Sequence, residues 1–132
     1  IEPEYRLDPE NSGVVPTGVG IISTAAEANG IHRALTAIHA PALHLLDFPE
    51  VTVAVDAQAN KGHSLSLLCA DLGIERHEVV AIGDSVNDAP MLAWAGRGVA
   101  MAHSDAYAMD AAREVLPHDG PDPLADFLDT LS

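Results

Sequence analysis

The chain has 132 residues, a length that suits one ordinary domain or parts of two small ones. Its formal net charge of −14 argues against a nucleic-acid-binding protein, because contact with phosphate backbones requires clustered Lys and Arg. No apolar run approaches the roughly 20 residues of a membrane-spanning helix, so neither nucleic acid nor a membrane is expected as a partner.

The first part of the chain predicts a small α+β layer. Thr24 and Glu27 have the spacing of a helix capping box, and apolar residues recur at helical spacing after them. Val51, Val53 and Val55 alternate with smaller or polar residues, as in a half-buried strand. The expected elements are, in order, an extended or looped start over residues 1–16, a strand over 18–23, a helix from about 24 to 39, and strands over 42–47 and 51–56.

After residue 56 strands and helices alternate, which predicts parallel strand pairs joined by right-handed crossovers. We expect helices over 61–72, 87–95 and 104–113, a last helix from about Pro123, and strands over 79–83, 98–101 and 114–116. The fold class is therefore α/β, with a Rossmann-like parallel sheet that follows a short α+β segment. We divide the chain into residues 1–57 and 58–132.

Several residues predict where these helices begin and end, and others predict which side of a helix is apolar. Gly73 is expected to end the helix that Lys61 opens, while Ser104 and Asp122 are expected to cap the two later helices. Leu65, Leu68, Cys69 and Leu72 lie on one apolar stripe of the helix 61–72. Cys69, the single cysteine, is interpreted as a buried thiol in a reducing, cytoplasmic protein.

A polar turn lies where the strand 79–83 meets the next helix. Asp84 follows Gly83 directly, Asp88 is four residues on, and Ser85 and Asn87 stand between them. Two carboxylates this close repel each other unless a cation holds them, and Mg²⁺ typically takes one or two carboxylates plus water and phosphate oxygens. A simpler interpretation stays open, because Asp and Asn are ordinary turn and cap residues.

The position of the turn and the only lysine of the chain favour the functional interpretation. Open α/β sheets bind ligands at strand-to-helix turns of this kind. Lys61 opens the preceding helix, at what should be the same edge of the sheet. For Lys61 alone, a solvated residue at a helix end would be the default interpretation.

The segment 83–92, Gly-Asp-Ser-Val-Asn-Asp-Ala-Pro-Met-Leu, resembles the fourth motif of the haloacid dehalogenase (HAD) superfamily, most closely that of the Cof-type phosphatases. The pair Lys61-Gly62 is similar to the lysine-glycine pair that opens the preceding helix in this family. The resemblance implies that residues 58–132 form the C-terminal half of a HAD core and residues 1–57 a remnant of its α/β cap.

Carried over residue by residue, the resemblance implies catalytic roles for Lys61, Asp84 and Asp88. Asp84 would bind Mg²⁺, and Asp88 would support the metal directly or through water. Asn87 would contact the phosphate, and Lys61 would bridge the phosphoryl group and a nucleophilic aspartate. Mg²⁺ and a lysine together would screen the charge of a phosphomonoester dianion under attack.

The nucleophile motif of the family, Asp-x-Asp-x-Thr, does not occur in the chain. By family order we expect it upstream of Ile1, so the N-terminal half of the same protein is an expected partner. The function expected of the whole protein is Mg²⁺-dependent hydrolysis of small phosphorylated metabolites through an aspartyl-phosphate. We expect the 132 residues alone to be inactive.

Two alternatives from other classes remain. P-type transport ATPases carry a similar Gly-Asp-x-x-Asn-Asp-Ala-Pro run in their phosphorylation domain, although Ser85 and the Met91-Leu92 pair favour the phosphatases. A non-catalytic module that retains the HAD fold is the second alternative. The scattered histidines show no zinc-binding spacing.

Overall fold

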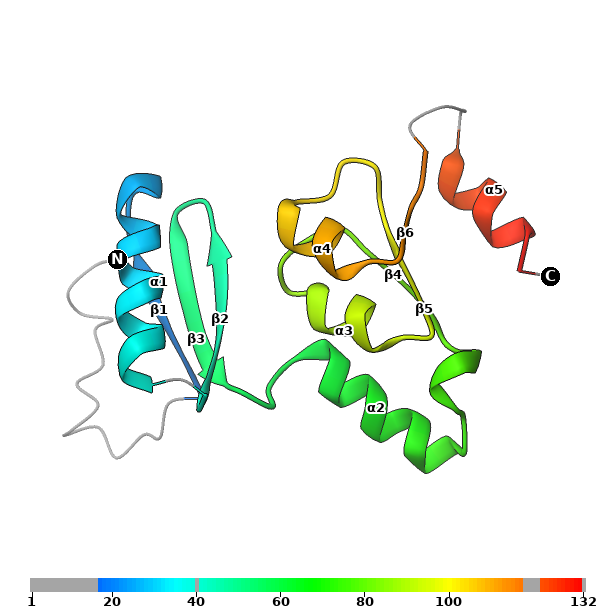
Figure 1. The fold of residues 1–132 in the computed structure, drawn as a ribbon, viewed down its shortest axis with the longest axis horizontal. Coiled ribbons are helices and arrows are strands. Elements are labelled where there is room, and N and C mark those ends of the chain that lie inside the picture. The colour runs from blue at the N-terminus through cyan, green and yellow to red at the C-terminus, as the bar shows by residue number, and fades with distance from the viewer. Residues whose placement is uncertain (1–16, 40, 118–121, 132) are drawn as a thin grey trace, which may run out of the picture. The chain divides into compact units, whose positions relative to one another are not determined.

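The computed structural model describes residues 17–39, 41–117 and 122–131, and two compact units divide between Asp56 and Ala57. Each unit is considered by itself below, and Figure 1 shows the elements of both. The expected looped start over residues 1–16 lies outside the described residues. No helix in the described part of the chain is both long enough and apolar enough to cross a membrane.

The first unit is an antiparallel three-stranded sheet with one helix, and the strand order is β1-β3-β2. Its elements are β1 (Gly18–Ile22), α1 (Ala25–His39), β2 (Leu43–Phe48) and β3 (Val51–Asp56). The expected strands and helix are thus present, with ends shifted by a residue or two. At the start of α1, one Glu27 carboxylate oxygen accepts hydrogen bonds from the backbone N–H of Thr24 at 3.0 Å and from its hydroxyl at 2.8 Å. The Glu27 carboxylate thus makes the bond back to the Thr24 N–H that the capping-box spacing predicts.

A polar chain connects α1 to the sheet of the first unit. Thr52 is fully buried, and its hydroxyl donates to Oδ1 of Asp47 at 3.1 Å. Nδ1 of His32, on α1, lies 2.6 Å from Oδ2 of the same carboxylate and forms an ion pair when His32 is protonated. An interior contact made of polar groups thus contributes to holding this helix on this sheet.

The second unit is an α/β layer whose sheet is parallel, with strand order β4-β5-β6, and it confirms the predicted fold class. Its elements are α2 (Lys61–Leu72), a 3-10 helix (Arg76–Glu78), β4 (Val80–Gly83), α3 (Ala89–Trp94), β5 (Arg97–Ala100), α4 (Ala106–Ala111), β6 (Glu114–Val115) and α5 (Pro123–Asp129). Every expected element of this half is present, although α3 and α4 are shorter than expected.

The helix ends confirm two cap predictions and correct a third. Gly73 has the left-handed backbone that ends α2, with φ 68°, and the Asp122 side chain accepts from the Ala125 N–H at the start of α5. The prediction that Ser104 caps α4 was wrong. Asp105 is the cap, because the chain is still extended there and its carboxylate reaches the N–H of Ala108.

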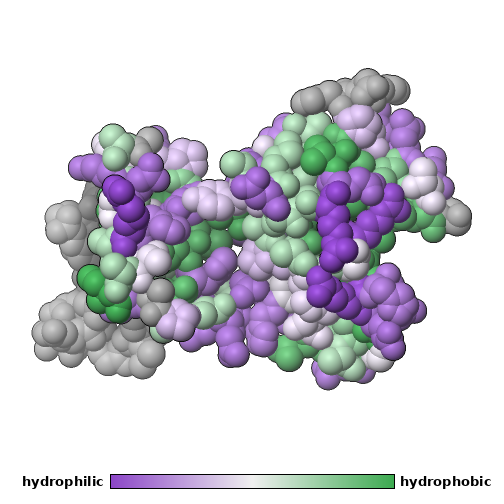
Figure 2. Space-filling view, in the orientation of Figure 1, coloured by the Kyte–Doolittle hydropathy of each residue, from purple (hydrophilic) through white to green (hydrophobic). Residues whose placement is uncertain are grey.

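Apolar side chains fill the second unit around two clusters. Leu92 is fully buried in the first cluster, and Val99 is fully buried in the second, beside Phe127. The prediction that Cys69 is buried is confirmed, whereas Leu68 and Leu72, on the same apolar stripe of α2, are more than half exposed. Figure 2 likewise shows hydrophobic residues at the surface, interspersed with hydrophilic ones.

Candidate active site

The polar turn lies at the carboxyl end of the parallel sheet, between β4 and α3. The carbonyl of Gly83, the last residue of β4, accepts a hydrogen bond from the Met101 N–H at 3.1 Å, just beyond the end of β5. The carbonyl of Asp84 accepts from the Asp105 N–H at 2.9 Å. Backbone bonds therefore join the turn to the segment that follows the neighbouring strand.

Asp88 is buried inside this turn and organises it. The residue is 6% exposed, and its Oδ2 accepts hydrogen bonds from the N–H groups of Asp84 at 3.0 Å and Ser85 at 3.2 Å. A side chain at Gly83 would exclude this arrangement, because its Cβ would lie 2.5 Å from Cβ of Asp88. We expected Asp88 in the first turn of the helix, but α3 begins at Ala89, so Asp88 precedes it and its carboxylate bonds back into the turn.

Lys61 contacts the other oxygen of the same carboxylate. Its Nζ lies 2.5 Å from Oδ1 of Asp88, while about half of the Lys61 side chain remains exposed to solvent. The neighbouring glycine permits this approach of α2 to α3, because a Cβ on Gly62 would lie 2.4 Å from the carbonyl oxygen of Pro90. The Lys61-Gly62 pair thus has a packing reason as well as an electrostatic one.

The pKa of Asp88 reflects these contacts. Burial raises the pKa of this carboxyl, but the hydrogen bonds from Lys61 and from the N–H groups of Asp84 and Ser85, together with the Lys61 charge, outweigh burial and hold the pKa below its usual range. Asp88 is therefore a carboxylate at neutral pH.

Asp84 has a different environment from Asp88. Its side chain is 52% exposed, and its Oδ2 lies 3.4 Å from Nε2 of His103. The Asn87 side-chain oxygen accepts a short hydrogen bond from the Ser85 hydroxyl, which leaves its amide N–H groups out of this bond. The turn thus combines one exposed carboxylate with one that is buried and fully engaged.

The structure brings the predicted residues together in part. Lys61 meets Asp88 directly, and Asp84 meets Asp88 through its backbone N–H. The cation in contact with the Asp88 carboxylate is thus the Lys61 ammonium group. Within the described ranges, no group of three or more His, Cys, Asp or Glu side chains could by itself hold a metal ion.

Sequence reasoning missed Asp105. Its Oδ2 accepts from the Val86 N–H at 2.7 Å, and its Oδ1 accepts from the Ala108 N–H at 2.9 Å. Asp before a helix is as good a cap signal as Ser, so the cap role was available from the sequence. The bond to Val86, nineteen residues away, becomes visible only in three dimensions.

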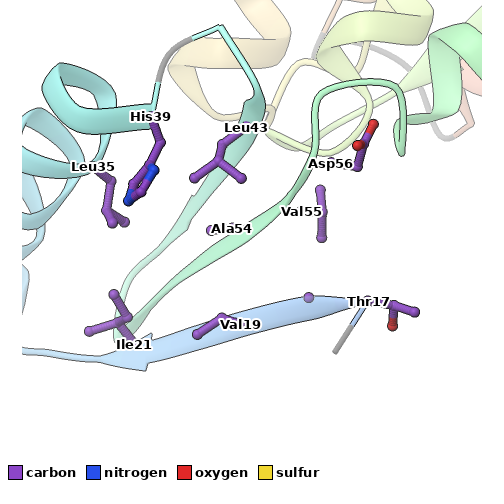
Figure 3. A pocket seen from close by; sticks show the side chains of 10 residues that line it. Thr17, Val19, Ile21, Leu35, His39, Leu43, Ala54, Val55 and Asp56 are labelled. Atoms are coloured by element: carbon purple, nitrogen blue, oxygen red, sulfur yellow. The ribbon is translucent and has the colours of Figure 1, made fainter. Parts of the chain in front are cut away.

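Hollows occur in both units, and one of them adjoins Lys61. An open groove of about 640 Å³ adjoins Lys61 and is lined mainly by small and apolar residues, including Leu65, Leu68 and Met91. In the first unit, a cavity of about 290 Å³ lies against α1 and the sheet, where Leu35 and His39 of α1 face Ile21 and Leu43 (Figure 3). The groove beside Lys61 is the one adjacent to the site.

A sequence-family comparison identifies the class of protein to which this fold and site belong. The family model of haloacid dehalogenase-like hydrolases matches residues 9–128, so the chain belongs to the haloacid dehalogenase-like hydrolase family. This confirms the resemblance seen in the motif around Asp84 and Asp88.

Two curated relatives that match part of the chain are named phosphatases. The chain is 42% identical over 71 residues to the phosphoglycolate phosphatase of Methanopyrus kandleri, covering 54% of this chain and 31% of that protein. It is 34% identical over 87 residues to the phosphoglycolate phosphatase of Archaeoglobus fulgidus, covering 66% and 39%. The matches to curated relatives thus span well under half of their length.

Solved structures share the fold. A haloacid dehalogenase-like hydrolase from Bacillus subtilis superposes with a TM-score of 0.69 at 27% identity, covering 81% of this chain and 39% of that one. One from Bacteroides thetaiotaomicron gives a TM-score of 0.66 at 26% identity, covering 95% and 48%. The chain therefore spans less than half of these structures.

Proposed function

We propose that this chain is part of a Cof-type, Mg²⁺-dependent phosphomonoester hydrolase that acts on small phosphorylated metabolites in the cytoplasm. The nucleophile would be an aspartate upstream of Ile1, and the reaction would pass through an aspartyl-phosphate. The observation that carries the proposal is the ion pair between Lys61 of α2 and Asp88, whose turn also holds the exposed Asp84 carboxylate. The family membership and the two relatives that are named phosphatases support it.

The donor set fits a magnesium ion at Asp84 better than at Asp88. Asp84 offers an accessible carboxylate, whereas both oxygens of Asp88 already accept hydrogen bonds, from Lys61 and from the turn. Asp84 would therefore hold the ion, and Asp88 would support it through water and by shaping the turn. Bound Mg²⁺ would supply neutralisation of phosphoryl charge, with its remaining ligands coming from water, substrate and the upstream segment.

Lys61 would bind the phosphoryl group. An ammonium group has three N–H donors, and one of them is directed to Asp88, which leaves two for phosphoryl and carboxylate oxygens. Because Asp88 anchors Nζ, the charge of Lys61 would be fixed in place before substrate arrives. The amide N–H groups of Asn87 would donate to the same phosphate oxygens.

The test is a complementation assay. This chain would be purified alone and then mixed with a separately produced upstream half, and p-nitrophenyl phosphate and phosphoglycolate hydrolysis would be followed with and without Mg²⁺. We expect no activity from the chain alone and Mg²⁺-dependent activity from the mixture. Lys61→Met and Asp84→Asn in this chain should each reduce that activity by about a hundredfold or more, as expected for removal of a charge-stabilising group.

Two controls make the assay decisive. Arg33→Gln removes a cation from α1, which belongs to the first unit whereas the turn belongs to the second, and should leave the rate unchanged. Turnover by the chain alone would contradict the upstream nucleophile. Full activity of the Asp84→Asn mixture would contradict the metal role of Asp84.

A further inference from the structure

We propose that Asp105 is a positioning residue for the candidate active site, because its carboxylate fixes the turn that directs the Asp84 carboxylate. The inference rests on the proposed function for what Asp84 does, and on the geometry alone for what Asp105 does. Asp105 would touch neither metal nor substrate. It would act through the backbone of Asp84 and Val86.

Three hydrogen bonds place Asp105 between α4 and the turn. Its Oδ1 accepts from the Ala108 N–H at 2.9 Å and so caps α4, while its Oδ2 accepts from the Val86 N–H at 2.7 Å. Its own N–H donates to the Asp84 carbonyl at 2.9 Å. One residue thus uses both carboxylate oxygens and its backbone to join two loops that lie nineteen residues apart in the sequence.

The same turn is held from its other side by Asp88. The Asp84 N–H donates to Asp88, and the Asp84 carbonyl accepts from Asp105, so both backbone groups of Asp84 are fixed. Val86, the next residue bound by Asp105, is 4% exposed. The backbone of the turn is therefore clamped between two carboxylates.

The Asp84 side chain has little else to orient it. It is half exposed, and the ion-pair partner found for it among the described residues, His103, is 64% exposed and 3.4 Å away. The backbone of the turn therefore sets the direction of its Cα–Cβ bond, from which its few staggered rotamers start. A carboxylate that binds a small, geometrically strict ion such as Mg²⁺ needs that direction to be fixed.

The substitution Asp105→Asn separates the two roles of the carboxylate. Asn is as good a helix cap as Asp, so its single carbonyl oxygen can still accept from Ala108. The other oxygen becomes an NH₂ group, which cannot accept from the Val86 N–H. Asp105→Asn should therefore keep the cap of α4 and lose the clamp on the turn, and Asp105→Ser provides a second variant that also caps.

The structure offers a matched control at Asp122. This residue caps α5 in the same way, with its carboxylate accepting from the Ala125 N–H at 3.0 Å, and that bond involves no residue of the turn. Asp122→Asn makes the same chemical change at a helix of similar length. Any effect of losing a negative charge alone would appear in both variants.

The first measurement is amide hydrogen exchange of this chain by NMR, without metal. In Asp105→Asn we expect exchange at Val86 to accelerate by about tenfold or more, the effect of losing a hydrogen bond to a charged acceptor. Exchange at Ala108 should change little, and Asp122→Asn should leave Val86 unchanged. Exchange at Val86 within twofold of the unsubstituted chain, in both Asp105→Asn and Asp105→Ser, would overturn the clamp.

The second measurement is the Mg²⁺ dependence of hydrolysis in the complemented protein. Asp105→Asn should raise the Mg²⁺ concentration for half-maximal rate by about tenfold, while the rate at saturating Mg²⁺ stays near that of the unsubstituted protein. An unchanged Mg²⁺ dependence with faster exchange at Val86 would overturn the positioning role. Absence of Mg²⁺-dependent hydrolysis in the unsubstituted protein would instead refute the proposed function, and would remove the reaction that Asp105 is proposed to serve.

Discussion

The two units of the chain are stabilised by different means. Among described residues of the first unit, Thr52 alone is fully enclosed, and it belongs to a polar chain with Asp47 and His32. The second unit has two buried apolar clusters, around Leu92 and Val99, and the buried charged residue found in its described part, Asp88, lies in the turn of the candidate site. In the first unit, polar side chains are part of the packing. In the second unit, the apolar clusters provide the packing, and polar side chains of the turn form the candidate active site.

The largest effect should come from emptying the apolar interior of the second unit. Leu92→Ala removes a fully buried side chain and should lower the free energy of unfolding of that unit by about 2–5 kcal/mol. Urea denaturation followed by the fluorescence of Trp94, the only tryptophan, reports on this unit.

The control for this prediction lies on α1 of the first unit. Ile38 is 72% exposed, so Ile38→Ala should change the stability of the first unit by less than about 0.5 kcal/mol, measured by hydrogen exchange over peptides of residues 17–56 because Trp94 lies in the other unit. If Ile38→Ala were as destabilising as Leu92→Ala, the exposed surface of α1 would be a packed interface, and the contrast between the units would fail.

A smaller effect is expected from breaking the ion pair at the site. Lys61→Met leaves the buried Asp88 carboxylate without its cation. We expect the second unit to lose about 1–2 kcal/mol of stability, less than for a fully buried pair, because Lys61 is half exposed. Lys61→Arg, which keeps the charge, should lose less.

The pH dependence of the same variant sharpens this test. The lowered pKa of Asp88 stabilises the folded unit above the unfolded value, about 4, and this stabilisation is lost as the pH falls through the folded pKa. Lys61→Met lacks part of the contribution, so its stability should depend less on pH in that acidic range. Denaturation midpoints at pH 3 to 7 provide the measurement, and identical profiles for the two proteins would contradict the ion pair.

The local signals of the sequence predicted the elements well. The order and the ends of the helices could be predicted from local signals such as Gly73, Asp122 and the alternation of strands and helices. Each of these signals reports a backbone constraint within a few residues. The Lys61–Asp88 proximity followed from the rule that helix starts and strand ends of parallel units share one edge.

Contacts between distant segments were less accessible from the sequence. The Asp105–Val86 bond depends on how two loops meet, and the exposure of Leu68 and Leu72 depends on what packs against α2. Helical periodicity identifies an apolar stripe, but it does not say whether a neighbour covers the stripe. The second oxygen of Asp105 is invisible to any pattern because its partner lies nineteen residues away.

The smallest effect is a difference between the two units in how their stability depends on pH. Burial lowers the pKa of His44 in the first unit, and its Nε2 is enclosed without a hydrogen-bond partner among the described residues. The unfolded chain therefore binds a proton at a higher pH than the folded unit does. The first unit should lose stability as the pH falls below about 6.5, the ordinary histidine value, and the loss should end once the folded His44 is also protonated.

Hydrogen exchange measured by mass spectrometry over peptides of residues 17–56 should show this loss between pH 7.5 and 5.5, and His44→Gln should reduce it. Peptides from the second unit should lose less protection over this range, because the pKa of the Asp88 carboxyl is held below its usual range and this group stays ionised. Equal loss of protection in both units, or an unchanged loss in His44→Gln, would show that the buried histidine does not set this difference.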